Sequence, residues 1–179
     1  MLTDGQKRAL LLIARRAVEA EVTTGQVVVY VPLDTLPAAQ GAFVTIKRRG
    51  ELRGCLGTLE CRASLDEEVR RCAAQAASED PRFAPVTASE LAELSIEVSV
   101  LGPIEPIDPH DPSAIGIGQH GLVVEQARRR GLLLPQVATE WGWDVAEFLA
   151  QTCVKAGLPR DAWRNGARVY RFAAEVFGD

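Results

Sequence analysis

The sequence predicts an α+β fold, with a mostly antiparallel sheet flanked by helices. Segments with apolar residues at helical spacing are interspersed with segments in which apolar and polar residues alternate. The strand pairs that can be recognised are hairpins, which join antiparallel strands and argue against a doubly wound parallel sheet. At 179 residues the chain fits one domain of ordinary size, and we expect a single domain over residues 1–179.

Composition indicates an ordinary globular protein. Hydrophobic residues make up 47% of the chain and charged residues 25%, which excludes the disordered and fibrous classes. No apolar run approaches the roughly 20 residues of a membrane-spanning helix, and Met1–Glu21 mixes charges through its apolar pattern, unlike a signal peptide. The four cysteines form no C-x-x-C pair, so we predict free thiols, no metal site and a reducing, cytoplasmic location.

The N-terminal segment predicts an amphipathic helix from Thr3 to about Glu21. Thr3 and Gln6 form a capping box, and apolar residues follow at helical spacing. A stretch punctuated by Gly and Pro follows, over residues 23–41. Within it, Val27–Val31 is a β-branched run that suits a short edge strand.

Residues 42–47 and 51–59 predict a hairpin around Arg48-Arg49-Gly50. The final glycine suits the left-handed position of a three-residue loop, which would pair Lys47 with Glu51 and Phe43 with Cys55. Alternation then gives the strands an aliphatic face for the core and a second face that suits either a covering helix or a cleft wall. The aliphatic face comprises Val44, Ile46, Leu52 and Leu56, and the second face comprises Phe43, Thr45, Arg53, Cys55 and Gly57.

The rest of the chain alternates between predicted helices and strands. Three further capping boxes each predict a helix, at Ser64 with Glu67, Thr87 with Glu90, and Asp144 with Glu147. Pro135 suits a helix start and Gly157 a helix stop. Strands are predicted over residues 94–100 and 168–177, a hairpin over 120–126 and 131–134, and a loop over 101–119.

Leu52–Thr58 is the segment that most suggests chemistry. Two glycines inside a strand indicate that a backbone or a ligand comes close. A thiol at Cys55 beside the Arg53 guanidinium would have its thiolate favoured, as a nucleophile requires. The alternative is that Cys55 is a small buried residue under a helix, with Arg53 paired to a carboxylate.

Other polar residues leave two interpretations open. Arg82, in Asp80-Pro81-Arg82-Phe83, suits either a carboxylate partner or an anion ligand. His120 is the better of two histidines for a general base, but a surface or capping role is favoured for it. The basic run Arg128–Arg130 suits a solvated turn, because a chain of net charge −4 gains little from binding phosphates.

Six segments together are highly specific, and on them the chain resembles the AMMECR domain family, also called AmmeMemoRadiSam system protein A. The segments are Leu52–Thr58, Asp80–Phe83, Gln119–Leu122, Gly131–Val137, Gly142–Asp144 and Lys155–Pro159. The resemblance is weakest over residues 23–41 and 101–117, and it fades at Glu60-Cys61, where relatives often place a proline.

The resemblance implies a larger and a smaller lobe with a cleft between them, whose wall would carry Arg53 and Cys55. The family supplies no reaction or cofactor. Its usual companions, a Memo-like protein and a radical S-adenosylmethionine enzyme, imply a modification pathway.

Two hypotheses follow for the function. In the first, an enzyme or ligand-binding protein uses Cys55 as nucleophile, Arg53 and Arg82 hold a small anionic ligand, and His120 moves protons. The other residues expected at this site are Gly54, Gly57, Thr58, Asp80, Gln136 and Lys155. In the second, the chain is a non-catalytic adaptor that binds a partner protein. RNA binding is least favoured, given the acidic balance and the few aromatics.

Overall fold

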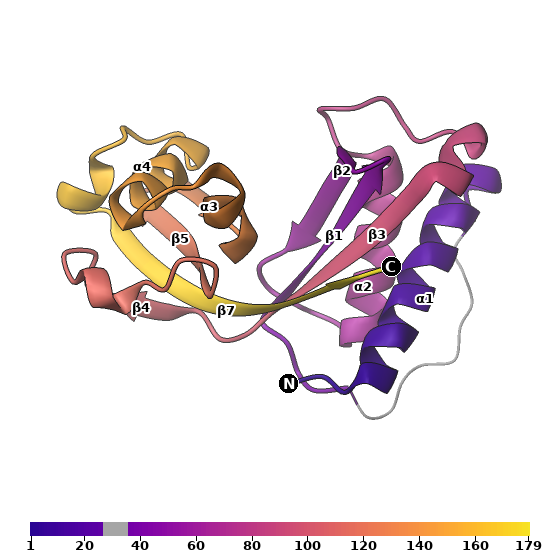
Figure 1. Cartoon of the computed structure of the whole chain (residues 1–179), viewed down its shortest axis with the longest axis horizontal. Helices are drawn as coiled ribbons and strands as arrows, with labels where there is room; N and C mark the ends of the chain where they lie inside the picture. The colour runs from indigo at the N-terminus through magenta and orange to yellow at the C-terminus, as the bar shows by residue number, and fades with distance from the viewer. Residues whose placement is uncertain (27–35) are drawn as a thin grey trace. The chain divides into compact units, whose positions relative to one another are not determined.

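The computed structural model describes residues 1–26 and 36–179, so the predicted strand Val27–Val31 lies outside the described residues. The chain divides into two compact units. The first unit comprises Met1–Leu101 together with Glu175–Asp179, and the second comprises Gly102–Ala174. Helices and antiparallel strands occur in both units (Figure 1), and the predicted α+β class is confirmed.

The elements follow the predicted order with few exceptions. The α-helices are α1 (Asp4–Thr23), α2 (Leu65–Ser78), α3 (Pro135–Trp141) and α4 (Val145–Lys155). The strands are β1 (Gly41–Arg48), β2 (Glu51–Thr58), β3 (Leu94–Leu101), β4 (Glu105–Ile107), β5 (His120–Gln126), β6 (Arg129–Leu133) and β7 (Arg168–Gly178). Short 3₁₀ helices are η1 (Ala88–Glu93), η2 (Pro112–Ala114) and η3 (Ala162–Arg164). In the part of the chain that the structure describes, no helix has the length and apolar character needed to cross a membrane.

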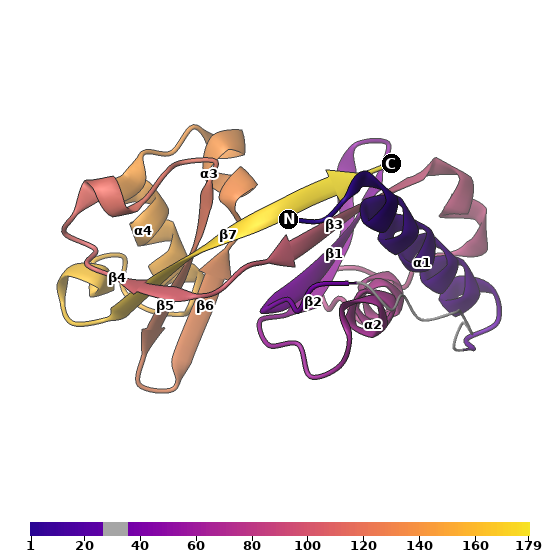
Figure 2. The same cartoon turned by 90° about the horizontal axis from the view of Figure 1, so that it is seen from below.

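In the first unit, α1 and α2 cover one face of a sheet ordered β2-β1-β3 (Figures 1 and 2). The end of β7 runs beside β3, where the Ile96 N–H donates to the Asp179 carboxylate at 2.8 Å. Val44 and Ile46 are fully buried under the helices, as predicted for the aliphatic face. Burial of such side chains contributes about 1.5–3 kcal/mol each, so this face holds the unit together.

The hairpin register differs from the prediction in two places. Arg48 pairs with Glu51, which leaves a two-residue loop, and both loop residues, Arg49 and Gly50, have positive φ (52° and 85°), as a type I′ turn requires. A bulge then places Arg53 as an extra residue between the pairs Lys47–Leu52 and Ile46–Gly54. Leu52 therefore leaves the core face and is 42% exposed, so its predicted place there is wrong.

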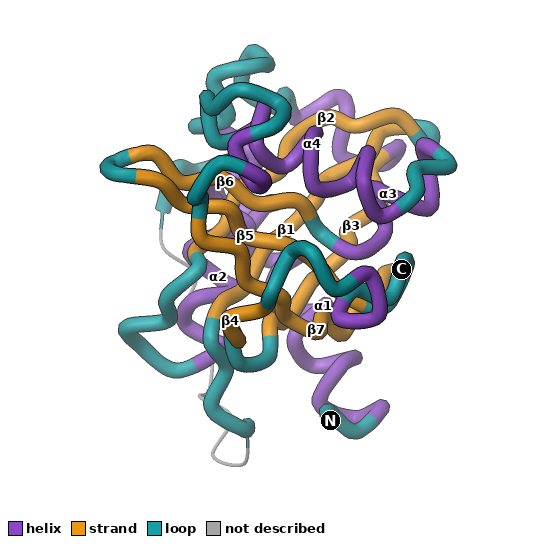
Figure 3. The backbone as a smooth tube through the Cα atoms, turned by 90° about the vertical axis from the view of Figure 1, so that its left-hand side faces the viewer, coloured by secondary structure: helices purple, strands orange, loops and turns teal. Residues whose placement is uncertain are grey.

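In the second unit, α3 and α4 pack on the strands β5 and β6 (Figure 3). β5 pairs with β6 and with β7, and β4 pairs with the other edge of β7. The predicted loop over residues 101–119 thus contains a short strand and the 3₁₀ helix η2. Alternation is too brief in three residues to predict β4, which forms because β7 offers an unpaired edge.

The predicted helix starts are only partly capped as expected. Thr3 forms its capping box with Gln6, and the Asp144 carboxylate accepts the Glu147 N–H at 2.8 Å. Ser64 precedes α2 but makes no side-chain capping bond. The box at Thr87 and Glu90 is formed, yet it opens the 3₁₀ helix η1 and not an α-helix, since β3 begins only six residues later.

Candidate functional site

Cys55 lies on β2, at the edge of the first unit's sheet, and is partly buried. It pairs with Thr45 of β1, and the Thr45 Oγ1 donates to the Cys55 Sγ at 3.2 Å. Because alternate residues of a strand share a face, both side chains lie on the face opposite α1 and α2. We call this the thiol face; its members are Phe43, Thr45, Lys47, Cys55, Glu97 and Ser99.

The thiol face also carries charged and hydroxyl groups. Glu97 stands opposite Thr45, and its carboxylate pairs with the Lys47 ammonium at 3.4 Å. Ser99 is 1% exposed, and its Oγ has no hydrogen-bond partner among the described residues. A buried hydroxyl is normally hydrogen-bonded, so the Ser99 hydroxyl is an exception within the thiol face.

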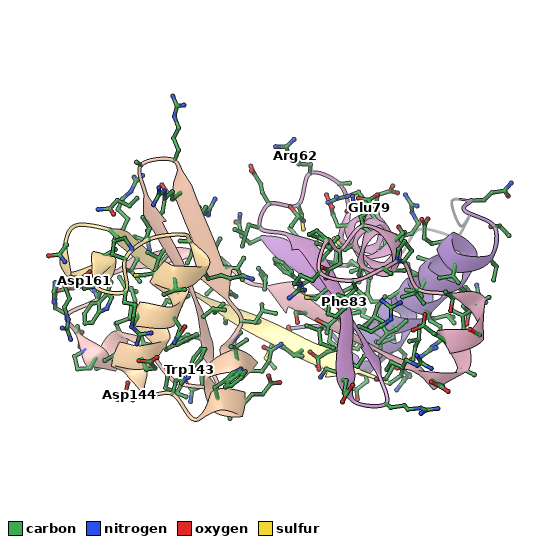
Figure 4. All side chains as sticks on the ribbon, turned by 90° about the horizontal axis from the view of Figure 1, so that it is seen from above. Arg62, Glu79, Phe83, Trp143, Asp144 and Asp161 are labelled. Carbon is green, nitrogen blue, oxygen red and sulfur yellow. The ribbon has the colours of Figure 1, made fainter. Side chains whose placement is uncertain are left out.

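Asp80 and Arg82 clamp the backbone of Cys55 at the edge of the sheet. The Asp80 Oδ2 accepts the Cys55 N–H at 2.8 Å, and the Arg82 Nη2 donates to the Cys55 carbonyl at 3.5 Å. The two side chains also bond each other, with Arg82 Nη2 at 2.7 Å from Asp80 Oδ2. The pair thus satisfies the groups that a neighbouring strand would bond. Glu79 and Phe83, which border this segment, are labelled in Figure 4.

The clamp has a strong electrostatic component. The Asp80 side chain is only 3% exposed, whereas that of Arg82 is 48% exposed. Hydrogen bonds from Arg82, joined by that of the Cys55 N–H, hold the pKa of Asp80 well below its usual range. Asp80 is therefore ionised at any physiological pH, and Arg82 keeps its Nη1 donors without a partner among the residues that the structure describes.

The Arg53 guanidinium is taken up by structural contacts. It forms a two-point ion pair with Glu90, with Nε 2.8 Å from Oε1 and Nη2 3.1 Å from Oε2. It also donates to the carbonyls of Ala84 and Pro85, at 2.8 and 3.2 Å. Hydrogen bonds from Arg53 lower the pKa of Glu90 to about 2. Arg53 thus ties the bulge of β2 to the segment before η1, as the carboxylate alternative predicted.

The protonation of Cys55 differs from the sequence prediction. Burial raises the pKa of the Cys55 thiol; the Thr45 hydrogen bond and the charge of Arg82 act in the opposite direction without reversing the shift. The expectation that Arg53 favours the thiolate was wrong, because that guanidinium is neutralised by Glu90. The thiol is consequently protonated at neutral pH.

The remaining motif residues of the first unit have packing roles. A Cβ on Gly54 would lie 2.1 Å from the Ala76 carbonyl oxygen of α2, and one on Gly57 would lie 2.3 Å from the Phe43 ring. The predicted close approach is therefore to a helix backbone and to an aromatic ring. Thr58 Oγ1 closes a turn with Glu60, donating to its carbonyl at 2.8 Å.

Three predicted site residues belong to the second unit. His120 Nδ1 accepts the Gly116 N–H at 2.9 Å, and burial, with the charge of Arg171, lowers the pKa of His120. His120 is therefore neutral, with its proton on Nε2. Gln136 lies in the first turn of α3, and Lys155 is exposed at the end of α4.

Sequence patterns missed Thr45 and Glu97 as partners of the thiol. Thr45 was assigned to the correct face, but its pairing depended on the bulge. Glu97 follows from the β1–β3 register, and no local signal fixes that register because β1 and β3 are far apart in sequence. Over residues 1–26 and 36–179, no three His, Cys, Asp or Glu side chains are grouped to hold a metal ion.

Comparison with known proteins agrees with the motifs. The AMMECR1 family model matches residues 11–177. The chain belongs to the AMMECR1 family. A protein of Methanothermobacter thermautotrophicus is 48% identical over 185 residues, covering 98% of this chain and 95% of that protein. One from Thermococcus gammatolerans is 49% identical over 180 residues, covering 94% and 87%.

A solved structure shares the fold of this family member. The crystal structure of an uncharacterised protein from Pyrococcus horikoshii is 43% identical to this chain and superposes with a TM-score of 0.92. The match covers 99% of this chain and 93% of that one. These AMMECR1 relatives establish family and fold.

Proposed function

We propose that this protein binds a small anionic ligand at the thiol face and that Cys55 reacts with it as a nucleophile. One observation carries this proposal: Asp80 and Arg82 bind the backbone of Cys55, whereas its thiol contacts only the Thr45 hydroxyl among the hydrogen-bond partners that the structure describes. The thiol lies on the face of the sheet opposite α1 and α2. Reactive groups work best when surrounding contacts fix their position. The motif around Cys55 fits that role.

The groups near Cys55 suit nucleophilic attack on a bound electrophile. The Thr45 hydroxyl already donates to Sγ and would stabilise the thiolate. Glu97, whose charge raises the pKa of the thiol, is the carboxylate of the face that could accept its proton. The Arg82 guanidinium interacts electrostatically with the Cys55 thiol, so its Nη1 group can supply donors to an anionic group beside the thiol.

We propose a cytoplasmic setting for this chemistry, based on the N-terminal pattern and the free cysteines. The family resemblance supports the further proposal of a modification pathway with a Memo-like protein and a radical S-adenosylmethionine enzyme. His120, Gln136 and Lys155 belong to the second unit, so they form no part of the site proposed at Cys55, and their roles as proton carrier and ligand contacts stay predictions.

A comparison of two alkylating agents tests the proposal. Iodoacetate is anionic and iodoacetamide is neutral, so an anion site at Arg82 should raise the iodoacetate-to-iodoacetamide rate ratio at Cys55. Cys61, also partly buried, is the internal reference. We expect a ratio several-fold higher at Cys55 than at Cys61, measured site by site by mass spectrometry. The rates of Cys55 with both reagents should rise only at a pH above the pKa of a free thiol, which is about 8.5, because the pKa of Cys55 is raised.

Two variants separate charge from structure. Arg82→Gln should remove the preference for iodoacetate, and Arg82→Lys should retain part of it. Cys72, which is fully buried with a pKa raised to about 11, must stay unmodified throughout as proof of folding. Equal ratios at Cys55 and Cys61, or a Cys55 that reacts only when Cys72 does, would refute the proposal and favour the adaptor hypothesis.

A further inference from the structure

The second unit exposes an aromatic pair that packing does not require. Trp141 ends α3 and is 70% exposed, and its ring stacks on that of Trp143, with centroids 6.0 Å apart and planes 17° from parallel. Trp143 packs against the core of the second unit. The pair thus has one anchored ring and one ring that presents apolar surface to solvent, which is unusual for a residue as large as Trp.

The helix end fixes this arrangement. Gly142 has φ 64° and ψ 33°, and its N–H donates to the Thr139 carbonyl at 3.2 Å. The Trp143 N–H then donates to the Ala138 carbonyl at 2.9 Å, which completes a Schellman turn. The glycine reverses the chain within one residue, so the two rings are preorganised and not merely adjacent.

The aromatic pair is bordered by carboxylates. Glu140 and Asp144 flank it in sequence and both are exposed, and residues 139–150 contain no Lys or Arg. Arg160 and Arg164 line a hollow with Asp144, but Arg160 is paired with Glu147 at 2.6 Å and Arg164 lies over the Trp163 ring. Figure 4 labels Trp143 and Asp144 side by side at the start of α4. Asp144 uses Oδ1 to cap α4. An aromatic face next to negative charge attracts cations and repels phosphates.

The chain itself shows which cation suits such a ring. The Arg164 guanidinium lies 4.5 Å from the centroid of Trp163, and that of Arg82 lies 5.5 Å from Phe83. Trp141 has no such cation among the residues that the structure describes. A planar guanidinium can stack on the indole and bond a carboxylate with two parallel N–H groups, which an ammonium cannot do.

We propose that Trp141, Trp143, Glu140 and Asp144 form the docking surface for an arginine-bearing segment of a partner protein. The surface lies wholly in the second unit and is independent of the chemistry proposed at Cys55. Its occupant is identified by charge complementarity, because the surface is acidic and aromatic. A fitting segment is extended and presents at least one arginine.

Indole signals in NMR spectra test this proposal directly. The protein has three tryptophans, so a ¹⁵N-labelled sample gives three indole N–H signals, with Trp163 as the internal reference. The probe is a ten-residue Gly/Ser peptide carrying two arginines. We expect saturable shifts of the Trp141 and Trp143 signals but not of Trp163. The citrulline peptide, planar but uncharged, should cause no shift, and the lysine peptide should bind at least several-fold more weakly.

Variants and competing occupants complete the test. Trp141→Leu should abolish the Trp143 shift and Glu140→Gln should weaken binding several-fold, while Glu79→Gln, an exposed acid of the first unit, should leave it unchanged. Equal binding of the citrulline peptide would overturn the proposal. So would stronger shifts with oligo(dT), or shifts that depend on protein concentration alone, which would indicate that the Arg128–Arg130 turn of a second copy is the occupant.

Discussion

Replacing Gly54 with alanine is expected to destabilise the first unit by about 3 kcal/mol or more, a loss typical of severe overpacking. The added Cβ would stand 2.1 Å from the Ala76 carbonyl oxygen, and a backbone atom cannot rotate away as a side chain can. Either α2 moves off the sheet or β2 bends outward. Both responses open the layer that buries Val69 and Cys72.

The measurement has to report on the first unit alone. All three tryptophans belong to the second unit, so their fluorescence does not follow the first. Pulsed alkylation of two fully buried cysteines across a urea series reports on each unit separately, because Cys72 lies in the core of the first unit and Cys153 in that of the second. We expect Gly54→Ala to lower the midpoint of Cys72 exposure strongly.

Gly5→Ala is the matched control for this substitution. Among the described residues, its Cβ would have only the Thr3 hydroxyl within 4 Å, at 3.9 Å, and alanine favours the helix by up to about 1 kcal/mol. The Cys72 midpoint should therefore stay or rise in Gly5→Ala. An unchanged midpoint in Gly54→Ala would mean that α2 does not approach β2 as closely as described.

Glycine spacing in β2 indicated a close approach, but sequence could not say what approached. A strand glycine admits a helix backbone, an aromatic ring or a ligand equally well, and the choice depends on which distant segment packs there. Here α2 and Phe43 fill the two places. The prediction located the crowded segment, and only the three-dimensional packing identified its neighbours.

The hairpin shows how two local errors can leave a face assignment correct. The two-residue loop shifts the register by one residue, which alone would exchange the faces. The bulge at Arg53 shifts it by one more and restores them, so Thr45 and Cys55 share a face as predicted, while Leu52, between loop and bulge, does not. Alternation predicts faces well, whereas a positive φ at Arg49 and a bulge leave little trace in sequence.

The charge partners around Cys55 could be named only in part. Asp80 and Arg82 are two residues apart, and their pairing was one of two stated alternatives. Their target, the Cys55 backbone, lies 25 residues away from Asp80 and has no sequence signal, because peptide groups are the same at every position. For the same reason Glu90 was predicted as a cap and not as the partner of Arg53.

Asp80→Asn is expected to cost about 2 kcal/mol at neutral pH, since it removes charge-assisted hydrogen bonds from a nearly buried carboxylate whose partner is half exposed. The pKa of Asp80 is depressed in the folded state, so its contribution is complete above the unfolded value of about 3.9 and is lost as the pH falls below it. Urea unfolding followed by circular dichroism should therefore show a stability difference between wild type and Asp80→Asn at pH 7 that shrinks toward pH 3.

The same variant distinguishes a clamp on Cys55 from a general structural contact. Asparagine keeps one acceptor oxygen and replaces the other with an NH₂ group, so it cannot serve both the Cys55 N–H and Arg82, and the edge of β2 should open more often under native conditions. Cys55 should then be alkylated several-fold faster while Cys61 and Cys72 keep their rates, and Glu79→Gln should change none of them. A uniform acceleration of all three thiols would show that Asp80 stabilises the unit as a whole, and the positioning role assigned to it would fall.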